Sequence, residues 1–196
     1  VLEGIAELAE ERGIIIISDE VYNRFMYDGK RHVSIASFTD NVILVDSFSK
    51  TYAMTGWRVG YVLAREPLLT PILRVHQYFM ASVSVVSQYA ALAALTGPQN
   101  FTKEMVSEFE ARRDLLIKEL SKIDGINCVK PDGAFYAFPN ISGTGMTGEE
   151  FSELMLNEAG VIVVPGGAFG EMGKNNIRFS YATDRERIIE ACERIK

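Results

Sequence analysis

The chain has 196 residues, and its 47% hydrophobic content is enough for the core of one large domain or two small ones. Twenty Lys and Arg residues against 26 Asp and Glu residues give a formal net charge of -6, which excludes a general attraction to nucleic acid or to an anionic membrane. Cys128 and Cys192 form neither a metal-spacing motif nor a disulfide framework. We therefore expect a globular protein without a metal site, in the reduced setting of the cytoplasm.

Apolar residues at helical spacing predict a helix over residues 1–12 that has no capping residue ahead of it, so we expect the back part of a longer polypeptide. Gly13 ends this helix, and β-branched runs at residues 14–17 and 42–45 predict two strands covered on both faces. A third strand is predicted over residues 58–64. If the first two strands are parallel, their carboxyl ends share one edge of a sheet, where open α/β folds bind ligands.

Residues 67–80 and 85–95 predict a pair of buried helices, because polar residues interrupt this charge-free stretch too often for a membrane span. Gly97-Pro98 breaks the chain, and residues 100–123 predict a long amphipathic helix. Short strands and two more helices follow, at residues 126–129, 134–138, 148–159, 161–164 and 177–182 and from Asp184 onward.

These elements predict an α/β fold with two domains joined by a helix. Residues 1–98 would be the C-terminal part of a large domain built on a mainly parallel sheet. Residues 99–123 would connect it to a small α+β domain at residues 124–196.

The run SDEVY at residues 18–22 follows the first predicted strand and places Asp19 and Tyr22 at the ligand-binding edge. A carboxylate favours the protonated form of a pyridine nitrogen beside it, and a phenol can donate to an oxygen on the same ring. An acidic loop end with a half-buried tyrosine is the alternative interpretation of these two residues taken alone.

Lys50 follows the second predicted strand in the run SFSK, and Arg58 stands eight positions further on. A lysine can form a Schiff base with an aldehyde, while the hydroxyls of Ser47 and Ser49 and a guanidinium can hold a phosphate. Alone, each of these residues is as well explained as a surface charge, a turn former or an ion-pair partner. Their conjunction at one edge points to pyridoxal phosphate chemistry.

Arg178 lies in the run NIRFSY at residues 176–181, where period-two alternation puts it on the polar face of a strand. Its planar guanidinium suits the carboxylate of an amino acid in a bidentate pair, although a structural salt bridge is the alternative. His32 and His76 have no partners at nucleophile or metal spacing and are interpreted as structural. The glycine-rich run at residues 165–170 lacks the lysine of a phosphate loop and is interpreted as a turn.

The chain resembles the class I and II aminotransferases, which are pyridoxal phosphate enzymes of fold type I, and in particular their aspartate and aromatic aminotransferase branch. The resemblance covers nearly the whole chain in family order. It is carried by SDEVY at residues 18–22, SFSKT at 47–51, GWRVG at 56–60, PDGAFY at 131–136, PG at 165–166 and RFSYA at 178–182.

This resemblance implies that Lys50 forms the internal aldimine with pyridoxal 5'-phosphate, with Asp19 at the pyridine nitrogen and Tyr22 at the ring hydroxyl. It implies that Ser47 and Arg58 hold the phosphate, with Ser49 as a weaker candidate. Arg178 would bind the α-carboxylate of the substrate. The catalytic residues are thus predicted to be Lys50, Asp19 and Tyr22, in a transferase fold whose large domain is only partly present here.

The resemblance further implies an enzyme of amino acid metabolism and biosynthesis that moves an amino group between an L-amino acid and a 2-oxo acid. Family members are considerably longer and complete their site with a second subunit, so we expect a homodimer in the whole protein and weak or absent turnover by this fragment alone. Apart from His76, no basic residue lies between Arg74 and Lys103, where one branch places an arginine that selects acidic substrates. Aspartate, aromatic amino acids and alanine all stay open.

Two alternatives share these motifs. A C–S lyase or another β-lyase of the same fold uses the same lysine and aspartate. The chain could also be the effector-sensing, non-catalytic domain of a transcription regulator that resembles an aminotransferase, in which case the acidic charge places any DNA contact elsewhere.

Overall fold

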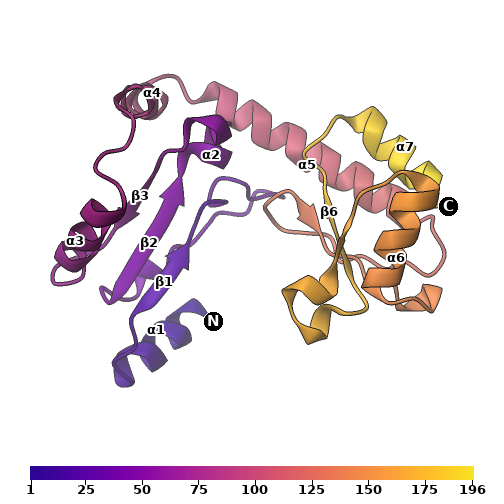
Figure 1. Cartoon of the computed structure of the whole chain (residues 1–196), viewed down its shortest axis with the longest axis horizontal. Helices are drawn as coiled ribbons and strands as arrows, with labels where there is room; N and C mark the ends of the chain where they lie inside the picture. Colours follow the sequence, from indigo (N-terminus) through magenta and orange to yellow (C-terminus); the bar gives the residue numbers. More distant parts are fainter. The chain divides into compact units, whose positions relative to one another are not determined.

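A computed structural model describes all 196 residues, which divide into two compact units (Figure 1). Unit 1 comprises Val1–Arg24 and Arg31–Lys103, and unit 2 comprises Phe25–Lys30 and Glu104–Lys196. Each unit has its own sheet and helices. None of the helices combines the length and hydropathy needed to span a lipid bilayer. The domain bounds expected from the sequence stay a prediction.

The sheet of unit 1 has three strands in the order β1-β2-β3, with bounds Ile16–Asp19, Val42–Ser47 and Gly60–Leu63 (Figure 1). β1 and β2 are parallel, which confirms the predicted pairing, and β3 is antiparallel to β2. The first strand begins two residues later than predicted. The reason is that Gly13 adopts a positive φ of 62° and the Ile14 N–H bonds back to the Ala9 carbonyl at 2.8 Å, so these residues finish the helix.

Helix α1 (Leu2–Glu11) covers one face of this sheet. Ala6 of α1 packs with Val42 of β2 and with Ile35, which lies in the short 3-10 helix η1 (Ile35–Ser37). On the opposite face, the side chain of Ile17 is 71% exposed. The prediction that the strands are covered on both faces is therefore wrong in this structure, because alternate residues of β1 face opposite sides and α1 covers only one of them.

Two helices lie beyond β3: α3 (Leu69–Phe79) and α4 (Val85–Thr96). Ala91 of α4 is buried against Phe48, Met54 and Val59, so α4 has a packed face. α3 has no buried residue, and its Tyr78 is 93% exposed. The predicted pair of buried helices is therefore wrong for α3, because no element of the chain packs closely enough against it to bury a side chain.

Helix α5 (Asn100–Leu120) begins in unit 1 and continues into unit 2. The sheet of unit 2 has the order β4-β6-β5 and is antiparallel throughout, with bounds Tyr136–Ala137, Val164–Pro165 and Ile177–Ser180 for β4, β5 and β6. α6 (Gly148–Leu154) and α7 (Arg185–Ile195) complete the unit, and a π-helical turn over Met155–Ala159 extends α6. Besides η1, unit 1 has a 3-10 turn at Thr55–Trp57, and unit 2 has three, at Ser142–Thr144, Gly166–Phe169 and Glu171–Gly173.

The strand predicted at residues 126–129 is wrong. Only Asn127 is paired there, through a single antiparallel bridge in which it exchanges two main-chain hydrogen bonds with Asn140 at 2.8 and 2.7 Å. No strand forms because the pairing stops after that one residue. The N-terminus of α7 agrees with the sequence, because the side chain of Asp184 caps it by accepting the Arg187 N–H at 2.9 Å.

Arg113 on α5 joins the separate segments of unit 2. Its side chain is fully buried, and its guanidinium donates to both oxygens of Asp28 at 2.9 and 3.1 Å and to the Pro131 carbonyl at 3.1 Å. It also lies 4.6 Å from the ring centroid of Tyr27. A buried guanidinium needs such partners, so this group ties the segment Phe25–Lys30 to α5.

The Glu108 carboxylate provides a test of the packing of α5 against α7. Arg185 and then Arg112 hydrogen-bond to it and lower its pKa to about 2, although desolvation opposes the shift. A carboxylate with a lowered pKa in the folded state stabilises that state above the unfolded pKa, and this stabilisation is lost as the pH falls through the folded value.

We predict that Glu108→Gln lowers the free energy of unfolding at pH 7 by about 1 kcal/mol or less, since the pair is solvent-screened. The difference between wild type and variant should shrink as the pH falls from about 4.5 towards 2. Denaturant unfolding across this range measures it, with Glu104→Gln as the control because Glu104 lies exposed on the same helix. Equal, pH-independent effects of both substitutions would contradict the assignment.

Candidate functional site

The strand register of unit 1 brings Asp19 and Ser47 to one face of the sheet. Asp19 pairs with Val45, and Ser47 lies two residues further along β2 and pairs with Gly60 of β3. Residues two apart on a strand share a face, so both polar side chains lie on the face opposite α1, where Ile17 is exposed. The predicted edge therefore carries these two residues on an open surface.

A tight turn after β1 carries Tyr22. The Glu20 N–H donates to the Val45 carbonyl at 2.9 Å, and the Asn23 N–H donates to the Glu20 carbonyl at 2.9 Å. The Asp19 carboxylate accepts the Val21 N–H at 3.2 Å. Asp19 is exposed and Tyr22 is half-buried.

Ser47 ends β2 and caps the short helix α2 (Phe48–Thr51). Its Oγ accepts the Ser49 N–H at 3.0 Å and lies 2.8 Å from the Ser49 Oγ. Lys50 is half-buried in this single helical turn. The predicted residues Ser47, Ser49 and Lys50 are therefore held together by the strand end and its cap.

The segment that contains Arg58 returns to the same cap. Arg58 has φ 50° and ψ 52°, a left-handed conformation that is uncommon for a residue with a side chain. The next residue, Val59, accepts hydrogen bonds from the Phe48 N–H and the Ser47 Oγ, both at 3.3 Å. The Arg58 guanidinium donates to the Thr55 carbonyl at 2.8 Å and its side chain is exposed.

Side chains from two later helices hold this segment in place. The buried Ser87 of α4 donates to the Trp57 carbonyl at 2.7 Å, and the buried Thr102 of α5 donates to the Thr51 carbonyl at 3.2 Å. Buried hydroxyls seldom lie without partners, and these two satisfy main-chain carbonyls of the segment that leads to the left-handed Arg58. Neither residue was identified from the sequence, where isolated Ser and Thr residues carry no distinguishing pattern.

Asp46 is a further group that the sequence analysis missed. Its carboxylate accepts hydrogen bonds from Asn23 Nδ2 and the Tyr61 hydroxyl, both at 2.8 Å, and from the Ser47 N–H at 2.6 Å. The available signal was a single acidic residue inside an otherwise apolar strand, directly before the SFSK run. Such a residue needs partners, and here it has three.

Glu20 forms a second carboxylate cluster beside Asp19. It accepts hydrogen bonds from Ser34 at 2.8 Å and Ser18 at 3.2 Å, and its other oxygen lies 2.8 Å from His32 Nε2. Burial alone would raise the pKa of Glu20, but the hydrogen bonds from His32 and Ser34 lower it below its usual value. His32 thus fits the structural role expected for it.

Arg178 lies on β6 in unit 2, so each of the two units holds part of the predicted set. Ile177 and Phe179 on either side of it are buried, which confirms the predicted alternation. Its guanidinium lies 4.7 Å from the Tyr136 ring centroid and 4.8 Å from that of Phe169. The structure shows no ion pair between Arg178 and a carboxylate, so two aromatic rings orient it in place of a salt bridge.

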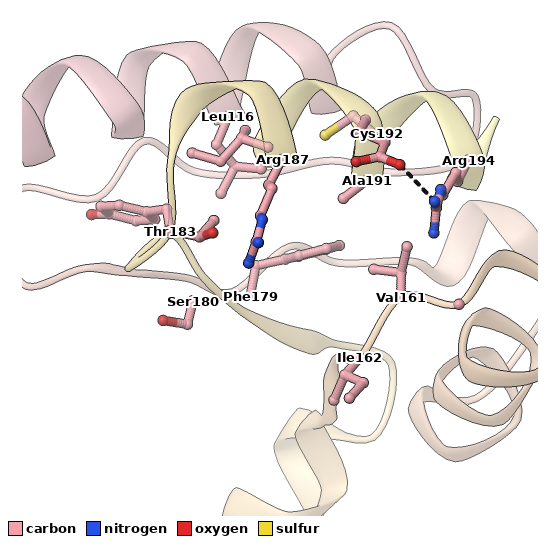
Figure 2. A pocket seen from close by; sticks show the side chains of 14 residues that line it. Leu116, Val161, Ile162, Phe179, Ser180, Thr183, Arg187, Ala191, Cys192 and Arg194 are labelled. Carbon is pink, nitrogen blue, oxygen red and sulfur yellow. Dashed lines mark hydrogen bonds and ion pairs between the residues drawn. The ribbon is translucent and has the colours of Figure 1, made fainter.

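Unit 2 also contains a cavity of about 520 Å³ beside α7 (Figure 2). Its walls are largely apolar and include Leu116, Val161 and Phe179, while Arg187 extends across it and Arg194 hydrogen-bonds to Glu190 at 2.5 Å. None of the predicted site residues lines this cavity. The predicted chemistry therefore does not depend on it.

Comparison with known proteins gives a consistent result. The family described as aminotransferase class I and II matches residues 1–195. The aspartate aminotransferase of Pyrococcus horikoshii is 45% identical over 195 residues, which are 98% of this chain and 50% of that protein. The aromatic-amino-acid aminotransferase 2 of Thermococcus litoralis is 45% identical over 200 residues, which are 100% of this chain and 51% of that protein.

A solved structure agrees with these relatives. The crystal structure of an aromatic aminotransferase from Pyrococcus horikoshii matches with a TM-score of 0.94 at 46% identity, over 99% of this chain and 53% of that one. The chain thus spans about half the length of the curated relatives it matches. These relatives do not favour the lyase or the effector domain.

Class I and II aminotransferases use pyridoxal phosphate, and the residues of unit 1 fit this group chemically. A phosphorylated pyridine aldehyde needs an amine, an anion for its ring nitrogen, and hydroxyl or cationic donors for its phosphate. Lys50, Asp19, Ser47, Ser49 and Arg58 supply these groups from one strand edge and the turns that follow it.

Gly60 allows the close strand contact that supports this edge. A Cβ added at Gly60 would lie 2.7 Å from the Asp46 carbonyl oxygen, whereas one added at Gly56 would meet nothing within 4 Å. We predict that Gly60→Ala destabilises the protein by about 1 to 3 kcal/mol because the main chain must shift. Gly56→Ala is the matched control in a thermal unfolding measurement, and equal losses from both substitutions would contradict the described packing.

Proposed function

The chain belongs to the class I and II aminotransferase family, and from this premise we propose that the whole protein moves an amino group between an L-amino acid and a 2-oxo acid. The observation that carries the proposal is the strand register that sets Asp19 and Ser47 on one open face, with Lys50 in the helical turn that Ser47 caps. When bound, pyridoxal phosphate supplies an electron sink for the substrate's α-carbon. The protein's contribution is binding, orientation and proton transfer.

We propose that Asp19 and Tyr22 hold the ring of the cofactor. The Asp19 carboxylate stabilises a proton on the pyridine nitrogen, because an adjacent anion favours the charged form of a base. Its exposed place at the end of β1 leaves it accessible to a ligand on the open face. The phenol of Tyr22, three residues later, donates to the ring oxygen.

The phosphate is assigned to Ser47, Ser49 and Arg58. Two hydroxyls lie at the first turn of α2, and the main chain next to Arg58 meets the same strand end through the Val59 carbonyl. The Arg58 side chain has one carbonyl partner and is exposed, so its remaining N–H groups can reach an anion. Helix α2 has only four residues, so we assign its contribution to phosphate binding to these side chains and not to a helix dipole.

Lys50 has two proposed tasks. Its Nζ would hold the aldehyde carbon of the cofactor, and as a free amine it would take up the proton of the substrate's α-carbon and return it to the cofactor. Both tasks require a neutral amine at the moment of reaction. The Thr102 and Ser87 hydrogen bonds would limit how far this turn can shift between the two tasks.

Arg178 is assigned to the α-carboxylate of both substrates. The guanidinium lies against the rings of Tyr136 and Phe169, and we expect its N–H groups to bind a planar anion. A carboxylate common to amino acids and 2-oxo acids explains how one residue serves both half-reactions. Relatives named for aspartate, aromatic amino acids and alanine leave the side-chain preference open.

We further propose that the whole protein is a homodimer in the cytoplasm and acts in amino acid biosynthesis. The family resemblance supports the dimer and the metabolic role, and the two free cysteines suit a reduced compartment. We expect the 196-residue chain alone to bind the cofactor weakly and to transaminate poorly. The reason is that the face carrying Asp19 and Ser47 is open to solvent, which weakens electrostatic and hydrogen-bond contacts to a ligand.

Product analysis tests the reaction class. We predict that the whole protein, loaded with pyridoxal phosphate and mixed with an L-amino acid, yields one equivalent of the 2-oxo acid and the aminated cofactor. Adding a second 2-oxo acid should restore the absorption spectrum that the loaded protein had before the amino acid was added. Release of ammonia and pyruvate would identify the lyase instead, and cofactor binding without any product would identify the effector domain.

Arg178→Lys tests the carboxylate assignment. We predict a rise in KM for both the amino acid and the 2-oxo acid of about 10- to 100-fold with a smaller change in kcat, because a lysine keeps the charge but loses the bidentate fork. Arg187→Lys is the control, because Arg187 is an exposed arginine of α7 and is not one of the predicted site residues. An unchanged KM in Arg178→Lys would exclude this residue from substrate binding.

A further inference from the structure

The carboxylate of Asp46 lies on the sheet face opposite Asp19 and Ser47, because it alternates with Val45 and Ser47 along β2. It is half-buried and is the one charged side chain of this strand. Its Oδ2 accepts hydrogen bonds from Asn23 and Tyr61, and its Oδ1 accepts the Ser47 N–H. Three segments of unit 1 therefore meet at one carboxylate.

These three contacts are not equivalent. Tyr61 belongs to β3, which main-chain pairing already holds beside β2, with Asp46 directly opposite Tyr61. Asn23 belongs to the turn that carries Tyr22, which the Glu20 N–H joins to the sheet through the Val45 carbonyl. The side-chain bond from Asn23 at 2.8 Å adds a second tie between that turn and the strand ending at Ser47.

The donors at Asp46 are neutral, so its charge strengthens each bond without forming an ion pair. Burial first, and then the hydrogen bond to Asp46, raises the pKa of Tyr61 to about 12, so the phenol stays a donor at neutral pH. The neighbouring carboxylate of Glu20 is occupied by His32, Ser34 and Ser18 and does not compete for Asn23. The Asn23–Asp46 pair is thus a separate clamp behind the open face.

We propose that Asp46 is a positioning residue for the transamination site, acting through Asn23 to fix the turn of Tyr22 relative to Ser47 and Lys50. This proposal rests on the proposed function, because it assigns Tyr22, Ser47 and Lys50 to one bound cofactor. Asp46 itself lies on the opposite face and touches neither cofactor nor substrate. Its effect is on the distance and orientation between the ring-binding and phosphate-binding sides of the site.

The test compares four variants of the whole protein: Asn23→Ala, Asp46→Ala, the double variant, and Tyr61→Phe as the matched control. Tyr61→Phe removes one hydrogen bond from the same Oδ2 without touching the turn. The first readout is the pH midpoint of the visible absorption of the bound cofactor, which reports the position of Tyr22 without requiring turnover. The second is kcat/KM, and the third is hydrogen exchange of residues 20–24 in the cofactor-free protein.

We expect Asn23→Ala and Asp46→Ala each to shift the absorption midpoint and to lower kcat/KM about tenfold, because small displacements of positioned groups are costly. Exchange of residues 20–24 should rise in both. The double variant should have the same midpoint and kcat/KM as Asp46→Ala, since both single substitutions break the same hydrogen bond between Asn23 and Asp46. Tyr61→Phe should keep the wild-type midpoint and kcat/KM.

An unchanged midpoint and kcat/KM in Asn23→Ala would overturn the positioning role, even if its melting temperature falls. An equal change in Tyr61→Phe would also overturn it, because the effect would then come from Asp46 in general and not from the turn. If Asp46→Ala does not fold, the midpoint and kcat/KM of Asn23→Ala still test the positioning role. A parent protein that binds the cofactor without transaminating contradicts the proposed function alone, and the absorption midpoints then still test Asp46. A parent that does not bind the cofactor overturns both.

Discussion

The parallel register of β1 against β2 is the constraint on which the rest of the candidate site depends. It pairs Asp19 with Val45 and so leaves Asp19 and Ser47 on one face, the face that α1 does not cover. If β1 and β2 slipped by one residue against each other, the side chains of one strand would turn to the opposite face, which α1 covers. The same register sets the end of β2 at Ser47, whose cap begins the turn that contains Lys50.

Groups outside the predicted site make hydrogen bonds that hold this edge. The Val59 carbonyl accepts a hydrogen bond from the Ser47 hydroxyl. Ser87 and Thr102 donate to carbonyls of the segment between Lys50 and Arg58. Asp46 joins the turn after β1 to β2 through Asn23. The left-handed backbone at Arg58 costs free energy that such contacts offset. Unit 2 uses aromatic rings for a comparable purpose, because Tyr136 and Phe169 orient Arg178 without a carboxylate partner.

The sequence was informative where local rules determine structure. β-branched runs, Gly13 and the SFSK segment predicted two parallel strands with polar residues at their ends, and alternation placed Arg178 correctly on its strand. Burial was harder to predict, because Ile17 and Tyr78 are apolar and yet exposed in a chain whose relatives are about twice as long. An apolar composition indicates that a surface can be buried, but it does not identify the element that buries it.

The Asn23–Asp46 tie could not be predicted, because its two residues are 23 positions apart and neither belongs to a recognisable motif. The central claim, that Lys50 carries the cofactor, is tested most directly by borohydride reduction of the whole protein loaded with pyridoxal phosphate, followed by digestion and peptide mapping. We predict a single stable label on Lys50, in the peptide that also contains Ser47 and Ser49. A label on any other lysine, or none, would contradict it.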